Sequence, residues 1–278
     1  MTKVMAVVLN YNSYEDSKRC VELLKKQEGV NLEIVIVDNC STDGNTHILD
    51  GLGEENQVIV IKNKENRGFS AGNNVGLRKA GERGCKYAMV INPDVEIRDK
   101  FYVAKAIEKM EEDNQIAVLG TNVINMAGQH QNPMREVRYW EEVLWPAVIV
   151  RNKLTKSLPY ICDYKKSGYC EKVSGCCFFV RMNFMEKIGY LDENVFLYCE
   201  EPILAATVKR EGDKMFYMHD IVAYHMHKEA EKGDPKKRLD TFLSSRIYYL
   251  NEYSNYGKIR KNIAIKSITL QNKIMTGR

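Results

Sequence analysis

The first 120 residues alternate between short, mostly apolar runs and longer stretches in which apolar positions recur with helical spacing. Runs rich in Val and Ile predict buried strands at 4–9, 32–37, 57–62, 87–92 and 116–120. The intervening amphipathic stretches predict helices over 14–27, 71–81 and 100–112. Strands that are apolar on both faces and alternate with helices are typical of an open α/β fold with a mostly parallel sheet flanked by helices.

The pattern changes after about residue 121. Residues 122–172 are irregular and polar, with an amphipathic helix predicted around 140–154, and we interpret them as an insertion. Regular patterns then return, with strands predicted within 172–181, 214–218 and 221–225 and helices from Met182 and over 201–212 and 236–256. We therefore expect one domain over 1–227, divided near residue 121, followed by a helical tail over 228–278.

Polar side chains follow each of the first four strands. They are Asn10 and Tyr11, then Asp38, then Arg67, and finally Asn92 and Asp94. In an open α/β sheet, ligands bind beyond the carboxyl ends of the strands. Turn and cap formation explains any single loop of this kind. Four such loops in succession predict a binding crevice.

Two common nucleotide-binding signatures are absent from the sequence. Gly68, Gly72 and Gly76 follow a GxxxGxxxG spacing and not GxGxxG, and no segment matches GxxxxGK[ST]. These absences count against a dehydrogenase and a P-loop NTPase. Small residues at every fourth position instead indicate a helix that packs closely on the sheet.

Charge and composition narrow the class of protein further. The formal net charge is only +4, which argues against a nucleic-acid partner. The basic excess lies in the tail, since residues 228–278 carry 12 basic and 5 acidic side chains. The eight cysteines contain no CxxC pair and predict reduced, mostly buried thiols. No apolar run approaches the ~20 residues that cross a bilayer, and the first ten residues do not resemble a signal peptide, so a cytoplasmic location is expected.

Six segments, in this order, resemble the family 2 glycosyltransferases, specifically the rhamnosyltransferase-like branch that builds bacterial surface polysaccharides. The segments are VVLNYN (7–12), VDNCSTDG (37–44), ENRGFSAGNNVGL (65–77), VINPDVEI (90–97), SGCCFFVRMNFMEKIGYLDENVFLYCEE (174–201) and YHMH (224–227). The resemblance covers residues 3–227. It implies an A-type nucleotide-diphospho-sugar transferase fold, with a nucleotide-binding half over 1–121 and an acceptor-binding half over 122–227.

The resemblance also implies the reaction. A UDP- or dTDP-sugar, dTDP-rhamnose among them, would donate its sugar with inversion to a hydroxyl of a bacterial glycan or lipid-linked glycan. A divalent cation, Mg²⁺ or Mn²⁺, would stabilise the departing diphosphate. Asp94 takes the family's Asp-x-Asp position and Asn92 replaces the first Asp. His225 resembles the family's late histidine and would complete the metal site, with His227 as a competitor.

The remaining roles follow from the same motifs. Glu201 takes the position of the general base, and Glu200 is the alternative. Asp38 resembles the residue that binds the nucleobase, flanked by Asn10 and Tyr11. Arg67 and Asn73, which lie in the segment 65–77, are further predicted donor contacts.

Two alternatives to this enzyme stay open. A nucleotidyltransferase would need a glycine-rich, lysine-containing loop after the first strand, which LNYNSYED lacks. A nucleotide-sugar-binding subunit without turnover, part of a polysaccharide assembly complex, gains weight from the departures at Asn92 and Glu201.

The tail has two interpretations as well. It lies on an anionic membrane as a peripheral contact at the inner leaflet, or it packs on the catalytic domain or on a second subunit of a homo-oligomer.

Overall fold

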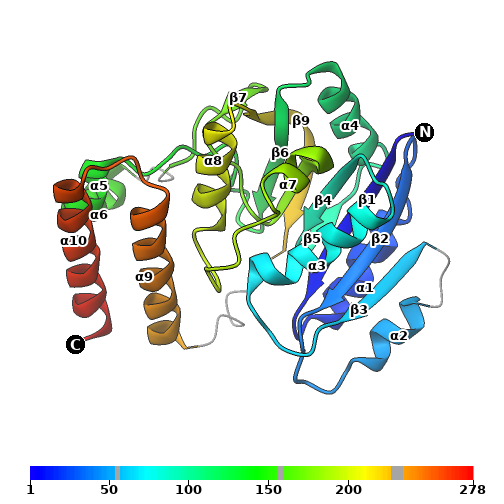
Figure 1. Cartoon of the computed structure of the whole chain (residues 1–278), viewed down its shortest axis with the longest axis horizontal. Coiled ribbons are helices and arrows are strands. Elements are labelled where there is room, and N and C mark those ends of the chain that lie inside the picture. The colour runs from blue at the N-terminus through cyan, green and yellow to red at the C-terminus, as the bar shows by residue number, and fades with distance from the viewer. Residues whose placement is uncertain (54–56, 156–159, 227–233, 278) are drawn as a thin grey trace.

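The computed structural model describes residues 1–53, 57–155, 160–226 and 234–277, without the side chain of Thr155. Within these residues a nine-stranded mixed sheet forms the centre of the molecule, with strand order β3-β2-β1-β4-β8-β6-β9-β5 and β7 paired to β9. Figure 1 shows this sheet with helices on both faces and a separate group of helices beside it.

The first four strands in this order are the predicted parallel unit. They are β1 (Lys3–Asn10), β2 (Asn31–Asp38), β3 (Val58–Lys62) and β4 (Tyr87–Ile91). β1 pairs in parallel with both β2 and β4, and Asn10 lies opposite Asp38 in the register. Because the strands are parallel and in register, their carboxyl ends and the polar residues that follow them meet at one edge of the sheet.

The other strands differ from the predicted alternation. β8 (Cys177–Arg181) lies antiparallel between β4 and β6 (Ile116–Asn125), so β6 does not neighbour β4. The strands predicted at 214–218 and 221–225 form one strand, β9 (Lys214–His225), which pairs in parallel with β6. A shift in register absorbs the residues between the two predicted strands. Two short strands, β5 (Val95–Ile97) and β7 (Gly168–Cys170), were not predicted.

Helices cover both faces of the sheet. The core of one face packs under α1 (Tyr14–Leu24), α2 (His47–Gly53) and α4 (Tyr102–Glu112). The core of the other face packs under α3 (Phe69–Glu82), α7 (Met182–Lys187) and α8 (Glu200–Arg210). A Cβ on Gly72 would lie 2.5 Å from Leu9, and one on Gly76 would lie 2.3 Å from Val7. The predicted close packing of this helix on the sheet is therefore confirmed. The short helix α2 was not predicted.

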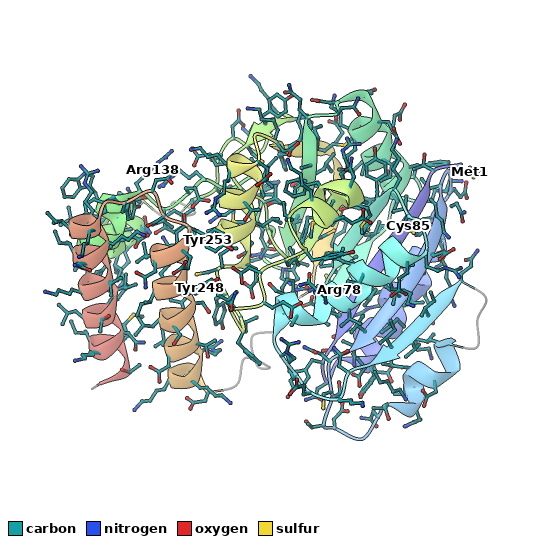
Figure 2. All side chains as sticks on the ribbon, in the orientation of Figure 1. Met1, Arg78, Cys85, Arg138, Tyr248 and Tyr253 are labelled. Atoms are coloured by element: carbon teal, nitrogen blue, oxygen red, sulfur yellow. The ribbon has the colours of Figure 1, made fainter. Side chains whose placement is uncertain are left out.

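Four further helices form the group beside the sheet. They are α5 (Tyr139–Val143), α6 (Trp145–Thr155), α9 (Pro235–Glu252) and α10 (Lys258–Thr276). Tyr248 of α9 and Tyr253, which directly follows α9, both donate hydrogen bonds to Asp192, at 2.8 and 2.5 Å, and lie between α9 and the main body in Figure 2. One face of the tail thus packs on the catalytic body. The predicted boundary between residues 227 and 228 lies outside the described residues.

The described ranges contain no helix of the length and apolar character needed to cross a bilayer. The eight cysteines are all free thiols, and five of them are buried.

Candidate active site

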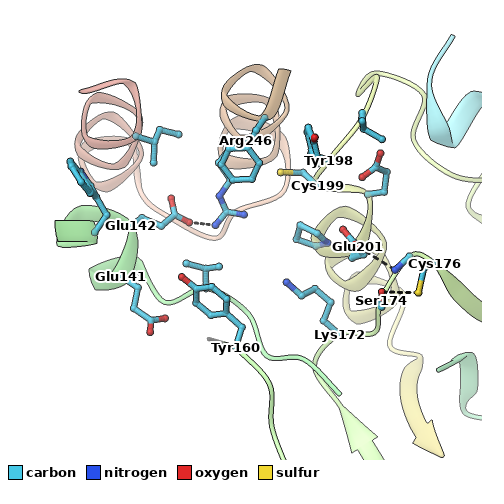
Figure 3. A pocket seen from close by; sticks show the side chains of 18 of the residues that line it. Glu141, Glu142, Tyr160, Lys172, Ser174, Cys176, Tyr198, Cys199, Glu201 and Arg246 are labelled. Carbon is cyan, nitrogen blue, oxygen red and sulfur yellow. Dashed lines mark hydrogen bonds and ion pairs between the residues drawn. The ribbon is translucent and has the colours of Figure 1, made fainter. Parts of the chain in front are cut away.

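Two cavities meet beyond the carboxyl ends of the strands. We call the first, of about 770 Å³, the strand-end cleft; its lining includes Tyr11, Asn39, Asn66, Pro93, Asp94, Phe196 and Lys237. We call the second, of about 670 Å³, the glutamate cavity; its lining includes Glu141, Glu142, Lys172, Glu200, Glu201, His225 and Arg246, several of which Figure 3 shows. Asn92, Phe69 and Leu197 line both. A ligand in one cavity therefore lies beside a ligand in the other.

Asn10 and Asp38 are joined at the ends of β1 and β2; both are buried and lie behind the lining of the strand-end cleft, next in sequence to Tyr11 and Asn39, which line it. The Nδ2 of Asn10 donates to Oδ1 of Asp38 at 2.8 Å and to Oγ of Ser41 at 3.2 Å, while its Oδ1 accepts from Ser17. Ser41 also donates to Asp38, at 2.6 Å. The amide of Asn10 is thus used within the protein, and it positions Asp38. Tyr11, 46% exposed, lines the cleft and is placed to meet a flat ligand there.

The turn after β4 fixes the direction of Asp94. The backbone N–H of Val95 donates to the carbonyl of Asn92 at 3.1 Å, which closes a four-residue turn around Pro93. The N–H of Met226 donates to the carbonyl of Asp94 at 2.8 Å. The turn is therefore held between the ends of β4 and β9. The ring of Pro93 restricts the backbone of this turn and so helps to aim the side chain of Asp94.

Asp94 lies against His225, and the pair fits a divalent cation. The Nδ1 of His225 lies 2.8 Å from Oε1 of Gln131, an atom that can only accept, so Nδ1 carries the proton. The other nitrogen, Nε2, lies 3.3 Å from Oδ2 of Asp94. In the neutral ring, a lone pair therefore faces a carboxylate oxygen, the arrangement of a histidine ligand oriented by a second partner.

The number of protein ligands at this position is small. Nowhere in the described ranges do three or more His, Cys, Asp or Glu side chains group as a metal cage. A cation held by Asp94 and His225 would take its other ligands from phosphate oxygens and water, as Mg²⁺ and Mn²⁺ do in many phosphate-binding sites. The second candidate histidine, His227, lies outside the described residues.

Two glutamates begin α8 at the wall of the glutamate cavity. The two preceding residues, Tyr198 and Cys199, have φ of 72° and 66°, a left-handed backbone that is strained for residues other than glycine. Oε1 of Glu201 accepts from the backbone N–H of Gly175 at 3.3 Å, and a Cβ on Gly175 would crowd the same oxygen. Strain and close approach together hold Glu201 in the cavity.

The two glutamates have different environments. Burial, together with the neighbouring charge of Glu201, raises the pKa of Glu200 to about 8. Oε1 of Glu200 has no hydrogen-bond partner among the described residues. Two neighbouring carboxyls in a buried position therefore favour sharing one negative charge, and the deeper burial favours the proton on Glu200. This difference favours Glu201 over Glu200 as a proton acceptor.

Two predicted donor contacts lie elsewhere in the structure. Arg67 has a side chain that is 60% exposed and pairs with Glu193 at 3.2 Å. Asn73 is fully buried on α3 and donates to the carbonyl of Phe69 at 3.0 Å. Neither residue lines the strand-end cleft or the glutamate cavity. Their role in donor binding stays a prediction, and this conformation does not bring them to the other site residues.

The sequence did not point to several residues that shape the cavities. Gly68, at φ 95°, lets the loop around Phe196 approach: the N–H of Phe69 donates to the Phe196 carbonyl at 2.9 Å, and a Cβ on Gly68 would lie 2.1 Å from that oxygen. Lys237, on α9, lines the strand-end cleft. A GxxxG spacing signals packing on the sheet, but nothing in the sequence signals a contact between residues 68 and 196.

A buried ion pair closes the far side of the glutamate cavity. Arg246 of α9 and Glu142 of α5 are 6% and 5% exposed and form a salt bridge. Lys172, 8% exposed, points into the same cavity in Figure 3. Buried charges of this kind are costly unless paired, so the Arg246–Glu142 pair fixes how the helix group sits on the site.

The chain matches known proteins over most of its length. The model of the family described as "Glycosyl transferase family 2" matches residues 5–189. The low-salt glycan biosynthesis hexosyltransferase Agl10 of Haloferax volcanii is 23% identical over 268 residues, which cover 95% of this chain and 80% of that protein.

Solved structures resemble the fold at low identity. Staphylococcus aureus TarS 1–349 in complex with UDP-GlcNAc gives a TM-score of 0.61 at 16% identity, covering 99% of this chain and 73% of that one. The mannosyltransferase PcManGT from Pyrobaculum calidifontis, in complex with GDP-Man and Mn²⁺, gives 0.62 at 15% identity, covering 99% and 72%. The predicted A-type nucleotide-diphospho-sugar transferase fold is confirmed. With the family model matching well over half of its length, the chain belongs to glycosyl transferase family 2.

Proposed function

We propose that this glycosyltransferase moves one sugar, with inversion, from a UDP- or dTDP-sugar to a hydroxyl of a bacterial glycan or lipid-linked glycan in the cytoplasm. The junction of the two cavities carries the proposal, because Asp94 lines one and Glu201 lines the other with Asn92 between them. The ligands in the similar structures, UDP-GlcNAc in one and GDP-Man with Mn²⁺ in the other, support a nucleotide-sugar donor. The resemblance to the rhamnosyltransferase-like branch makes dTDP-rhamnose one donor to test.

The nucleoside end of the donor would lie in the strand-end cleft. Asp38, held by Asn10 and Ser41, is the proposed acceptor of hydrogen bonds from the pyrimidine base. Tyr11 would stack against the base or the ribose. Uracil and thymine share the edge that Asp38 would bind, so the choice between UDP and dTDP depends on other contacts.

The diphosphate would lie near Asp94 and His225. A bound Mg²⁺ or Mn²⁺ supplies Lewis-acid stabilisation of the leaving diphosphate. Asp94 and His225 would hold that cation, and Lys237, which lines the same cleft, would add a second positive charge. Asn92 adds no charge at the position where an Asp is common in the family, so the ammonium group of Lys237 gains importance here.

Glu201 would accept the proton of the attacking hydroxyl. The acceptor oxygen bonds to the anomeric carbon on the side of the glutamate cavity, the bond from that carbon to the diphosphate breaks on the side of the strand-end cleft, and the hydroxyl proton moves to Glu201. Because the attacking acceptor oxygen and the leaving diphosphate oxygen would lie on opposite sides of the anomeric carbon, the configuration of that carbon would be inverted. A proton on Glu200, whose pKa is raised, would leave Glu201 without a second negative charge beside it.

A donor-turnover assay tests the proposal. The purified chain is incubated with Mn²⁺ and a panel of UDP- and dTDP-sugars, and release of the nucleoside diphosphate is measured with and without glycan acceptors. We expect release with one donor and its loss in Glu201→Gln. Donor binding without turnover in the wild type would instead favour the nucleotide-sugar-binding subunit.

A further inference from the structure

Helix α10 has one face packed on the protein. Its buried residues are Ala264, Ile268, Asn272 and Thr276, which recur at every fourth position and so share one side of the helix. Ala264 and Ile268 form a cluster with Leu250 of α9. Ser267 Oγ donates to the carbonyl of Glu142 on α5 at 3.0 Å. This side of α10 is therefore fixed on α9 and α5.

The opposite side of α10 carries large aliphatic side chains in the solvent. We call Ile259, Ile263, Leu270 and Ile274 the outer stripe; they are 77%, 44%, 55% and 60% exposed. Their spacing of 4, 7 and 4 positions places them on one side of a helix, turned away from the buried residues. Ordinary surface helices place polar residues there, so the outer stripe needs an apolar partner.

The charges on α10 all have one sign. The helix contains Lys258, Arg260, Lys261, Lys266 and Lys273 and no acidic residue. Lys266 and Lys273 are exposed and lie at spacings that place them beside the outer stripe. Aliphatic side chains with flanking lysines suit the boundary between acyl chains and anionic headgroups, because the lysine stem lies in the apolar layer while its ammonium group meets phosphate.

The place of α10 in the molecule matches such a contact. In Figure 1 α10 is the outermost element, separated from the main body by α9. In the nearby segment of α5 and α6, four large side chains are each more than half exposed to solvent: Trp140, Leu144, Val150 and Leu154. On its inner side, α10 contributes Ile268 and Gln271 to the lining of the glutamate cavity. One helix thus connects the acceptor side of the site with an exposed apolar surface.

We infer that the outer stripe of α10 docks on a bilayer rich in anionic lipid. Docking places the glutamate cavity at the membrane surface, where it would receive an acceptor glycan that is anchored in the lipid. The part about the acceptor rests on the proposed function, whereas the docking itself rests only on α10. A second copy of the chain is the alternative occupant of the stripe.

Vesicle flotation tests the docking. The whole chain is mixed with vesicles of phosphatidylcholine alone, or with about one third phosphatidylglycerol, and the floated fraction is measured at low and high salt. Two variants remove the two parts of the surface: Ile263→Ser with Leu270→Ser, and Lys266→Glu with Lys273→Glu. The control is Lys18→Glu with Lys26→Glu, the same charge change at exposed positions near α1.

We expect flotation with the anionic vesicles, weakened by salt, and a loss of at least about tenfold in each α10 variant but not in the control. Equal flotation of all variants, or none of the wild type, would overturn the inference.

Light scattering after gel filtration adds a check on the alternative occupant. If the wild type forms a dimer that the serine variant dissociates, and does not bind vesicles, the stripe would be assigned to a second copy. Turnover of the donor in solution should be unchanged in the α10 variants. Flotation without any transferase activity would remove the proposed function and leave the docking standing.

Discussion

The strand-end cleft and the glutamate cavity share a wall but are built by different chemistry. Beside the cleft, amide and hydroxyl groups bond to one another and to a carboxylate, as Asn10 does with Ser41 and Asp38. Around the cavity, glutamates face cations, as Glu142 does with Arg246. Hydrogen bonds between neighbouring strand ends hold these side chains in fixed positions, because the strands themselves are paired. Charged pairs between helices far apart in sequence give a wall whose position depends on tertiary packing.

This difference separates binding from proton transfer. If it is correct, changes on the cavity side should reduce turnover and leave nucleotide affinity intact, and changes on the cleft side should do the reverse.

The largest expected effect is that of Glu201→Gln. Removal of a general base typically lowers kcat by about 10²- to 10⁴-fold, and the affinity for the nucleoside diphosphate should stay the same. Steady-state kinetics and calorimetric titration measure the two quantities. The matched control is Glu200→Gln, which keeps the neutral state that Glu200 already has at pH 7 and should retain most of the turnover. Comparable losses in both variants would reject the division of roles.

The next effect concerns the loop that both cavities share. Gly68→Ala places a Cβ against the Phe196 carbonyl and should destabilise the fold by roughly 3 kcal/mol. Gly84 also has a positive φ, of 68°, but has open space around it, so Gly84→Ala should cost only about 1 kcal/mol. Urea denaturation compares the two. Equal costs would show that backbone strain, and not contact with Phe196, sets the requirement.

A third test uses the raised pKa of Glu200. A carboxyl whose pKa is about 8 in the folded protein and near 4.5 in the unfolded chain contributes stability below pH 4.5, and this stability is lost as the pH rises to 8. The free energy of unfolding of the wild type should therefore fall between pH 4.5 and pH 8 relative to Glu200→Gln, by about 4 kcal/mol. Parallel pH profiles for the two proteins would show that Glu200 ionises normally.

The smallest effect distinguishes two predicted donor contacts. Asn10→Ala frees Asp38 from one of its two partners and should weaken nucleotide binding by about 1.4 kcal/mol, or tenfold. Arg67→Ala should change affinity less than about twofold, because Arg67 is exposed and lies outside the cleft. A larger loss for Arg67 would mean that the loop carrying it moves onto the donor.

The parallel unit was predictable because its signal is local. Runs such as 4–9 and 32–37 are apolar on both faces, and the polar groups that follow them share an edge of the sheet by topology alone. The placement of β8 between β4 and β6 was not predictable. β8 comes about 85 residues after β4 in the chain and pairs with it in the antiparallel direction. The periodicity of the sequence carries no signal for such a distant pairing.

The site was predictable to the same extent. Asp94, His225 and Glu201 came from motifs and lie around one junction. Arg67 also came from a motif, but its ion pair with Glu193 holds it outside the cleft. Contacts between distant elements, such as Arg246 with Glu142, could not be anticipated, since neither residue carries a pattern that names its partner.

The most direct test of the account is calorimetric titration of UDP and dTDP into the chain with and without Mn²⁺. Asp94→Ala is compared with Asp16→Ala, a second carboxylate that lines the same cleft away from His225. Mn²⁺ should strengthen binding of one nucleotide at least about tenfold in the wild type and in Asp16→Ala. Asp94→Ala should abolish this gain while metal-free binding persists. An undiminished gain in Asp94→Ala would contradict the role of Asp94 in holding the cation.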